Sequence, residues 1–520
     1  MKKPIKKAYL ALYLIAVPFL TFAQGQNFEI GRNTEIFMAL MKELNNNYVD
    51  EISPGGLTRT ALEAMLESLD PYTNYISEAD VEEYRFITTG EYGGVGVLTH
   101  MKGDTIIISE IHDNSPAAKA GIKTGDRILK VNGENAIGKS DASMALIMKG
   151  QPGVEISLTV LSPGKNQIRD ISLKRENVKL GSIPTSLMLR KGIGYICLER
   201  FTQGAARDVR NALEKLRASD TLTGLIIDLR GNGGGLLNEA VGICNLFVGK
   251  GQHIVSTRGR FLARSQEYGT TLDPIAPQLP LVILVDESSA SASEIVAGAL
   301  QDIDRAVVVG QKTYGKGLVQ NIIPLPYNAQ VKITVAKYYI PSGRCIQAID
   351  YQHRDENGVA TKTSTDQIKQ FLTRNGRIVK DAGGIEPDMK PDSIPLPGSL
   401  AGIVAGQYLF DFVTLYAAHN DIIPPVNEFI PDEQLFEDFR NYLIRQNYPV
   451  TPQFEVFQEE LLNTISDNKT DSSMVHVFDA LISQYKTKVM NDLERSKDFI
   501  NVSLQVNQAG SVSCASEIRF

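Results

Sequence analysis

The spacing of hydrophobic residues changes along this chain and divides it into four stretches. Within residues 28–85 apolar residues recur every three or four positions, which predicts helices. Residues 93–178 show short apolar runs between glycine turns, which predict strands and one short helix. From Gly192 short apolar strands alternate with amphipathic segments, so we expect an α/β layer. From about Gly398 the pattern is mostly helical.

The clearest local signals lie in the second and third stretches. Asn132-Gly133 between two apolar runs is typical of a β-hairpin. The segment from Asp141 to Met148 predicts a short helix. Further along, a continuous apolar strand, Val282 to Val285, enters a turn of serines and alanines, and Glu294 to Leu300 continues as a helix.

The first residues indicate the cellular compartment of the protein. Four lysines within residues 2–7 precede a short apolar run, Ala8 to Phe22, and Thr21-Phe22-Ala23 places small residues where a signal peptidase needs them. This pattern predicts a secretory signal peptide, cleaved after about Ala23, and export to the periplasm. The alternative is an uncleaved anchor that keeps the protein at the membrane. The run of about 15 residues is shorter than the roughly 20 that span a bilayer.

Charge and cysteine usage limit the partners. The formal net charge is −7, and removing residues 1–23 with their four lysines takes it to −11. An acidic exported protein does not attract nucleic acid by charge. Cys197, Cys244, Cys345 and Cys514 show no CxxC spacing, so no zinc site or disulfide framework is indicated. We expect no metal and no cofactor, and we expect Cys197 and Cys244 to be buried in apolar surroundings.

The serine-rich turn is a candidate for catalysis. A serine between a strand and a helix has an exposed hydroxyl and lies beside helix N-terminal amides that can stabilise an oxyanion. The alternative is that these serines only cap the helix.

A serine nucleophile needs a base, and none of the six histidines lies in a recognisable triad motif. A lysine can serve if burial lowers its pKa toward neutrality. The segment GQKTYGKGLVQ offers Lys312 and Lys316, and Lys316 lies between two glycines, which allow close backbone approach. Gln320 would share its face if this segment is a strand, where it would orient the amine. The alternative is a solvated loop lysine.

A glycine loop follows another buried strand in DLRGNGGGLLNEA. Residues 231–235 leave their backbone amides unobstructed at the start of a helix. Such a loop binds anions such as phosphate, but no Lys-Ser/Thr follows, so it is not a phosphate loop of the GxxxxGK[ST] type. Its amides would equally complete an oxyanion hole.

Together these blocks resemble the carboxyl-terminal processing peptidases, also called tail-specific proteases. The resemblance covers roughly residues 30–395. It rests on LDPYTNYIS, GEYGGVGV, NSPAAKAGIKTGDRILKVNG, DLRGNGGG, SASASEIVAGALQD, YGKGLVQ, YYIPSGRCIQ and GIEPD, which stand in the family's order.

The resemblance implies roles for particular residues. The middle serine of SASAS, Ser291, corresponds to the nucleophile, Lys316 of the YGKG block to the base, and Gln320 to the residue that supports the lysine. The oxyanion hole would combine the amide of Ala292 with that of Gly234. The family more often has NPGG in this loop, where Gly233 replaces the proline. Cys345 replaces a residue that is often serine, and we expect little consequence.

Residues 93–178 resemble a PDZ domain. The strand start formed by Gly94, Val95, Gly96 and Val97 would present backbone amides to a peptide C-terminus, and the peptide would add as a strand to the sheet edge. The alternative is a PDZ domain used only for packing.

The implied fold is mixed α/β: a ClpP/crotonase-like protease core with an inserted PDZ domain and helical N- and C-terminal regions. The expected segments are a signal peptide (1–23), an N-terminal helical region (24–92), the PDZ domain (93–178), the protease core (179–395) and a C-terminal helical extension (396–520).

The implied function is that of an exported serine endopeptidase. It would bind protein or peptide substrates by their C-termini and cleave them through an acyl-enzyme. An adaptor protein and a homo-oligomer through the terminal helical regions are compatible with this organisation. Two alternatives remain: a catalytically inactive PDZ scaffold, and an acyl-CoA enzyme of the related crotonase-like fold. The intact Ser291 and Lys316 argue against both.

Overall fold

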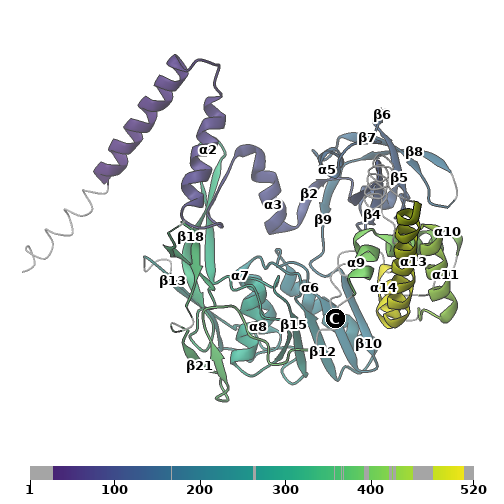
Figure 1. Cartoon of the computed structure of the whole chain (residues 1–520). Helices are drawn as coiled ribbons and strands as arrows, with labels where there is room; N and C mark the ends of the chain where they lie inside the picture. The colour runs from purple at the N-terminus through teal and green to yellow at the C-terminus, as the bar shows by residue number, and fades with distance from the viewer. Residues whose placement is uncertain are drawn as a thin grey trace, which may run out of the picture. The chain divides into compact units, whose positions relative to one another are not determined.

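The structure is a computed structural model with two compact units, which are described separately (Figure 1). The first unit holds the chain up to Glu78 together with Asn321–Thr334, and the second holds Ala79–Gln320 and Val335–Phe520. The residues described are 27–448, apart from 165–166, 262–264, 357, 365, 367, 392–396, 421–423 and 425–428, together with 472–508. The predicted signal peptide lies outside these residues.

The first unit combines helices with a short antiparallel pairing. Residues 27–47 are helical, and α2 (Pro54–Glu67) begins at Ser53, whose side chain caps the helix. Strand β1 (Asn74–Ile76) then pairs with residues 330–332 of β18 (Gln330–Tyr339). The helical spacing predicted the helices but missed β1. The buried side chain of Asp70 accepts the amides of Tyr72 and Thr73 and so turns the chain from α2 toward β1.

The second unit begins with a six-stranded antiparallel sheet. Its order is β3-β4-β5-β7-β8, with β6 paired to β5, so β3 is an edge strand. As predicted, Asn132 and Gly133 join β5 to β6, with φ values of 51° and 82°. The elements of this region are α3 (Val81–Thr89), β2 (Glu91–Gly94), β3 (Val97–Lys102), β4 (Thr105–Ile111), α4 (Pro116–Lys119), β5 (Arg127–Val131), β6 (Glu134–Asn135), α5 (Asp141–Met148), β7 (Glu155–Leu161), β8 (Ile168–Lys174) and β9 (Glu176–Lys179).

An α/β layer follows. Its sheet has the order β10-β11-β12-β15-β16, in which β11, β12, β15 and β16 run parallel and β10 is antiparallel to β11. Because β12 and β15 are parallel neighbours, the loops that leave their carboxyl ends meet at one edge. The elements are β10 (Thr185–Arg190), β11 (Ile193–Cys197), α6 (Ala205–Ser219), β12 (Gly224–Asp228), α7 (Leu237–Asn245), β15 (Leu281–Val285), α8 (Ala292–Asp302) and β16 (Val307–Gly310).

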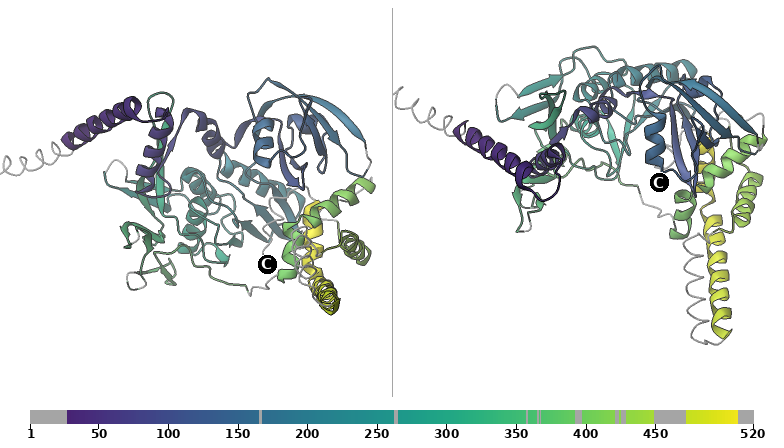
Figure 2. Two further views of the ribbon diagram at one scale, coloured as in Figure 1. Left: turned by 45° about the horizontal axis from the view of Figure 1, so that its top comes forward. Right: turned by 90° about the horizontal axis from the view of Figure 1, so that it is seen from above.

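Smaller sheets and a helical region complete the second unit. Residues 336–339 of β18 pair with β13. The C-terminal helices pack on one another and appear green to yellow in Figure 2. The elements are β13 (His253–Gly259), β14 (Gln266–Gly269), β17 (Leu318–Pro324), β19 (Ile349–Arg354), β20 (Ala360–Lys362), β21 (Gln370–Leu372), β22 (Ile378–Lys380), α9 (Gly398–Ala405), α10 (Tyr408–His419), α11 (Glu433–Arg445), α13 (Ser472–Arg495) and α14 (Lys497–Gln508).

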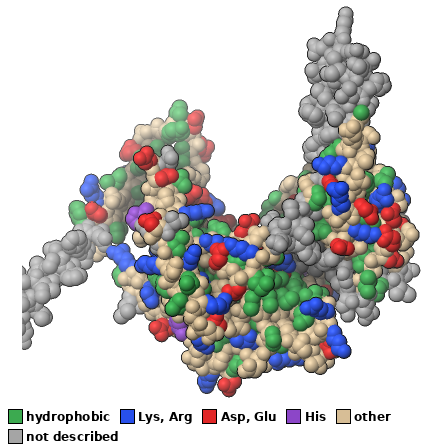
Figure 3. All heavy atoms as spheres, turned by 60° about the horizontal axis from the view of Figure 1, so that its bottom comes forward, with side chains coloured by type: hydrophobic (Ala, Val, Ile, Leu, Met, Phe, Trp, Pro, Cys, Tyr) green, Lys and Arg blue, Asp and Glu red, His purple; other side chains and the backbone are tan. Residues whose placement is uncertain are grey.

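Each of these regions has an apolar core of its own. Ile283 belongs to the core of the α/β layer, Ile128 to that of the six-stranded sheet and Phe436 to that of the C-terminal helices, and all three are fully buried. Burying such a side chain stabilises the fold by roughly 1.5–3 kcal/mol. On the face drawn in Figure 3, acidic and basic side chains are mixed. Among the described residues, no helix is both long and apolar enough to cross a bilayer.

Candidate active site

The turn between β15 and α8 carries Ser291 in an unusual backbone conformation. Ser291 is the N-cap of α8, with φ 57° and ψ −111°. Positive φ is uncommon outside glycine, and strained residues of this kind cluster at functional sites. Ala292 is the first residue of α8 and is fully buried. Its amide is one of the helix N-terminal donors that have no partner within the helix.

The serines of the SASAS turn are not equivalent. Ser289 and Ser293 are fully buried, and their hydroxyls donate to the carbonyl oxygens of Leu229 (2.7 Å) and Asn232 (2.8 Å). Both therefore fasten the turn to the loop after β12. Ser291 is partly exposed. Of these three serines it is the one placed to meet a substrate.

The segment before β17 brings Lys316 to this turn. The buried side chain of Glu294, in the first turn of α8, accepts hydrogen bonds from the amides of Ser291 (2.8 Å) and Lys316 (2.9 Å) through the same oxygen, Oε2. The backbones of Ser291 and Lys316 are therefore neighbours. Lys312 is exposed, and its amine faces Glu386 at 3.9 Å. The structure thus brings Lys316, and not Lys312, to the serine turn.

The glycines on either side of Lys316 are needed for this approach. Gly315 has φ +89°, and a Cβ there would lie 2.5 Å from the side chain of Ala348. A Cβ on Gly317 would lie 2.8 Å from the backbone nitrogen of Gln347. Neither position has room for a side chain. The sequence-based interpretation of these glycines as sites of close backbone approach is confirmed.

The glycine loop after β12, residues 231–235, packs against the other side of the serine turn. The Gly231 amide donates to the carboxylate of Asp286, at the end of β15 (3.1 Å). Gly234 has φ +98°, and a Cβ there would lie 2.6 Å from the Ala290 carbonyl oxygen and 2.9 Å from the Ala292 nitrogen. The structure therefore places Gly234 directly beside Ala292 and the nucleophile turn.

Asn232 holds this loop in place. Its fully buried side chain donates to the Leu198 carbonyl (2.6 Å) and accepts the Gly234 amide (2.8 Å). Its carbonyl oxygen accepts the Ala290 amide (3.0 Å) as well as the hydroxyl of Ser293. The Gly234 amide is thus engaged by Asn232, and it must exchange that partner before it can serve an oxyanion.

Four of the five candidate catalytic residues are brought together, namely Ser291, Lys316, Ala292 and Gly234. The fifth, Gln320, is the third residue of β17 and is partly exposed. The expectation that it lies on a strand after Lys316 is confirmed, whereas its role in supporting the lysine stays a prediction. Tyr338 adds a contact that was not expected, because its hydroxyl donates to the Ser291 carbonyl at 3.2 Å.

Sequence reasoning missed Asn232 and Glu294 as parts of the site. Glu294 stands three residues after Ser291, which is the spacing of a helix capping box, so a local signal for it was present. Burial raises the pKa of the Glu294 carboxyl to about 7, against the lowering effect of its hydrogen bonds to Thr313, Lys316, Ser291 and Gly315. No local signal links Glu294 to a loop about twenty residues away.

The proposed peptide-binding strand start is built mainly from backbone contacts. The Val95 amide donates to the Met148 carbonyl (3.1 Å), so it is not available to a ligand carboxylate. Gly96 has φ +83°, and its carbonyl oxygen accepts the His112 amide (3.0 Å). Gly94 ends β2, and Val97 begins the edge strand β3. The side chains of Val95 and Val97 belong to the core of the six-stranded sheet.

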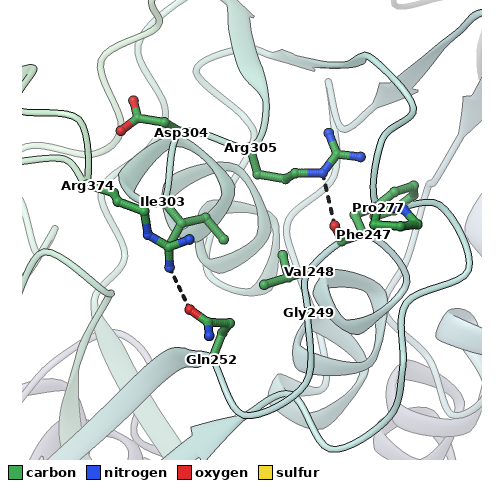
Figure 4. A pocket seen from close by; sticks show the side chains of 9 residues that line it. All are labelled: Phe247, Val248, Gly249, Gln252, Pro277, Ile303, Asp304, Arg305 and Arg374. Carbon is green, nitrogen blue, oxygen red and sulfur yellow. Dashed lines mark hydrogen bonds between the residues drawn. The ribbon is translucent and has the colours of Figure 1, made fainter.

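A pocket of about 380 Å³ lies away from the serine turn. Ile303 to Arg305, beyond the C-terminal end of α8, line it, whereas Ser291 is at the N-terminal end (Figure 4). An eleven-residue helix such as α8 separates its ends by about 16 Å. The polar groups are paired with each other: Arg305 donates to the Phe247 carbonyl, and Arg374 donates to Gln252 (Figure 4).

Metal binding has no candidate site in the described part of the chain. No group of His, Cys, Asp or Glu side chains there is arranged to hold a metal ion. Cys197 and Cys244 are buried, as expected, and burial raises the pKa of the Cys244 thiol to about 12. Cys345 is partly buried, and Cys514 lies outside the described residues.

Three family models match the chain. Residues 192–355 match peptidase family S41, residues 93–173 match a PDZ domain, and residues 400–508 match the C-terminal helical domain of probable PDZ-proteases. These matches define a serine peptidase with a PDZ domain and a C-terminal helical region.

Relatives make the assignment more specific. The carboxy-terminal-processing protease of Bartonella bacilliformis is 34% identical over 348 residues, which cover 66% of this chain and 80% of that protein. A probable CtpA-like serine protease of Staphylococcus aureus is 33% identical over 308 residues, covering 59% and 61%. The chain belongs to the carboxy-terminal-processing protease family, within peptidase family S41.

Two solved structures to which the chain is similar in sequence have related descriptions. The photosystem II D1 C-terminal processing protease is 25% identical, covers 71% of this chain and 95% of its own, and has a TM-score of 0.37. The PDZ domain of a carboxy-terminal protease from Vibrio cholerae, solved in complex with peptide, is 28% identical, covers 17% and 99%, and has a TM-score of 0.17.

Proposed function

We propose that this protein is an exported endopeptidase that cleaves peptide bonds by a Ser-Lys mechanism and recognises protein C-termini through its PDZ domain. The observation that carries the catalytic part is the shared contact on Glu294, which receives the amides of both Ser291 and Lys316. Two backbones held on one carboxylate allow the Ser291 hydroxyl and the Lys316 amine to approach each other, as general-base catalysis requires.

The reaction follows from the roles of these side chains. The neutral amine of Lys316, supported by Gln320, takes the proton of the Ser291 hydroxyl as Oγ attacks the carbonyl carbon of the scissile bond. The Ala292 amide and the glycine loop stabilise the oxyanion, with Gly234 contributing once it leaves Asn232. Lys316 then gives its proton to the departing amine. Water, deprotonated by Lys316, hydrolyses the Ser291 ester and releases the new C-terminus.

The remaining parts of the proposal concern the whole chain. Residues 1–23 would direct export to the periplasm and be removed after about Ala23, or remain as an anchor. The amides of Gly96 and Val97 would bind a terminal carboxylate, with Gly94 held by its pairing with Glu176, while the edge of β3 accepts the tail as an added strand. No metal or other cofactor is required by this mechanism. An adaptor protein and self-association through the terminal helices are compatible additions.

Labelling by a fluorophosphonate probe tests the nucleophile. The probe should modify Ser291 in the intact protein, and Ser291→Ala should abolish both labelling and peptide cleavage without loss of folding. Ser288→Ala is the matched control, because Ser288 is exposed in the same turn. This substitution should leave labelling and peptide cleavage unchanged. Labelling elsewhere, or cleavage near the wild-type rate by Ser291→Ala, would overturn the assignment.

Substitution of the lysines tests the base. Lys316→Arg should lose activity nearly as fully as Lys316→Ala, because a guanidinium effectively cannot give up its proton to act as a base. Lys312→Arg serves as the control and should keep activity, since Lys312 is exposed and faces Glu386. Substantial turnover by Lys316→Arg would make Lys316 a positioning charge and not a base.

A further inference from the structure

Glu294 is a buried acidic residue that the catalytic steps do not use. It lies in the first turn of α8, and no part of its side chain is accessible. A buried carboxylate is costly unless its oxygens are paired. The groups around Glu294 must therefore compensate the free-energy cost of burying its carboxylate in the protease core.

Both oxygens of Glu294 are fully used. Oε2 accepts the amides of Ser291 (2.8 Å) and Lys316 (2.9 Å). Oε1 accepts the Gly315 amide (2.7 Å) and the Thr313 hydroxyl (2.6 Å). An ionised carboxylate has about four lone-pair sites, so these four donors match its capacity. Three of the four donors belong to the loop of the proposed base, and the fourth is the amide of the proposed nucleophile.

We infer that Glu294 is a positioning residue, whose ionised carboxylate joins the nucleophile turn to the lysine loop and assembles the active site only while it carries its charge. The inference rests on the proposed function. A proton on Oε2 would present an O–H where only two amide donors point, so a bond is lost there. A proton on Oε1 would force the Thr313 hydroxyl, which already accepts the Ile385 amide, to give up its donation to Glu294. The lysine loop would then separate from Ser291.

The surroundings of Glu294 contain few other ionisable groups. Tyr314 and Lys312 in the loop are exposed, Tyr338 of β18 donates to the Ser291 carbonyl, and Glu386 faces Lys312. The titratable residues on the elements packed around Glu294 are Asp286, Lys312, Tyr314, Lys316, Tyr338 and Glu386. Burial raises the pKa of Glu294 and outweighs the lowering by its hydrogen bonds, so that the net value is about 7.

The sign of the pH effect follows from this shift. The folded pKa, about 7, lies above the ordinary value of 4.5, so folding favours the protonated form. The stability from this group is present below about pH 4.5 and is lost as pH rises through about 7. Activity should move the other way, because the ionised form holds the site together. The active form is thus the less stable one.

The first experiment compares Glu294→Gln with the wild type. Glutamine has nearly the same shape, but its amide nitrogen cannot accept a hydrogen bond, so one pair of donors loses its acceptor. We expect kcat for an unstructured peptide to fall about 100-fold or more, the order of loss for a misplacement of about 1 Å. The melting temperature of the wild type should fall between pH 5 and pH 8, and this fall should be absent in Glu294→Gln.

The melting curves are measured in the Ser291→Ala background, with and without Glu294→Gln, so that titration of the base in catalysis cannot enter. Asp302→Asn is the matched control, since Asp302 is a buried carboxylate at the other end of α8, bound to Arg344 at 2.7 Å. It should lower stability without changing the pH profile of kcat. An unchanged slope of melting temperature in Glu294→Gln would overturn the inference.

A second variant covers the case in which Glu294→Gln fails to fold. Thr313→Val removes one donor from the carboxylate and should raise the pH at which kcat begins to fall, whereas Thr313→Ser keeps the hydroxyl and should restore it. An acid limb that does not move in Thr313→Val would contradict the inference. Failure of the proposed function appears differently, as an unlabelled Ser291 in the wild-type protein.

Discussion

Two glycine-rich segments of this chain are proposed to present backbone amides to a peptide, and they are held in different ways. The loop of residues 231–235 is fixed by the buried side chain of Asn232, which binds Leu198 and Gly234 at once. The segment from Gly94 to Val97 is fixed mainly by backbone bonds, such as that from Val95 to Met148. The first is packed against another loop, and the second leads into an edge strand.

The difference corresponds to what each segment has to do. The Asn232 side chain holds the loop against the nucleophile turn, which favours catalysis because an oxyanion hole depends on positioned donors, but it also engages the Gly234 amide, which must be released before it can serve as such a donor. A peptide that adds to a sheet edge brings its own hydrogen-bonding pattern, and an edge strand with an unpaired side suffices for it. Substitutions in the first segment should therefore have large effects on rate, and changes in the second should have modest effects on affinity.

The largest effect is expected for Gly234→Ala. A Cβ at this position would lie 2.6 Å from the Ala290 carbonyl oxygen and would push the nucleophile turn away from the loop. The φ of +98° adds strain. We expect kcat for a short peptide to fall by about 100-fold or more, as for other small misplacements of reacting groups. The measurement is steady-state cleavage, with a thermal melt to show that the variant is folded.

Gly233→Ala is the control for this loop. A Cβ on Gly233 would meet nothing within 4 Å. Gly233 also takes the place where the family more often has proline, so a side chain should be tolerated. If Gly233→Ala and Gly234→Ala lost activity to the same extent, Gly234 would not be required for close packing against the turn of Ser291.

The sequence predicted much of this site because its signals are local. The strand Val282–Val285, the serine turn and the helix after it form one continuous pattern, and the structure has β15, Ser291 and α8 there. The close approach at Gly315 and Gly317 was also visible from the glycines alone. The long-range contacts of the site could not be predicted from the sequence. Glu294 contacts Lys316, and Asn232 contacts Ala290, only because parallel strands bring their loops together.

The same limit applies to the proposed peptide groove. The resemblance to a PDZ domain predicted that the strand start from Gly94 to Val97 presents its amides to a peptide, but sequence could not show that the Val95 amide is already bound to Met148. It also could not show that Val97 packs into the core. The sequence indicates which backbone amides could face a ligand, and the tertiary contacts decide which of these amides are available to bind it.

An intermediate effect is expected when the terminal charge of a bound tail is removed. A peptide with an amidated C-terminus should bind more weakly than the free acid by roughly 1–3 kcal/mol, the approximate cost of leaving a polar group unmatched. Calorimetry on the whole protein carrying Ser291→Ala, which prevents cleavage, gives the two affinities. Equal affinities would remove carboxylate recognition from the account and leave the protease assignment intact.

The smallest effect concerns the outer edge of β3. The Met101 amide does not donate to β4 but to the carboxylate of Asp141, at the start of α5, at 3.0 Å. Among the strands that the structure describes, none pairs with β3 on that side. A tail that adds to β3 and reaches Met101 must therefore displace Asp141 from this amide.

Asp141→Ala frees the Met101 amide and should strengthen binding of a six-residue tail by about 0.5–1.5 kcal/mol, the net value of one hydrogen bond. Asp141→Asn keeps an acceptor at the same place and should bind the tail about as the wild type does. A three-residue tail held at Val97 would not extend to Met101, four positions further along β3, so its affinity should not change. An equal gain in affinity for the three-residue and the six-residue tail would mean that Asp141 acts through the charge of the domain. No gain in affinity for either tail would place the bound tail away from this edge. The length dependence therefore decides whether the edge of β3 takes up an added strand or the PDZ domain holds only the terminal residue.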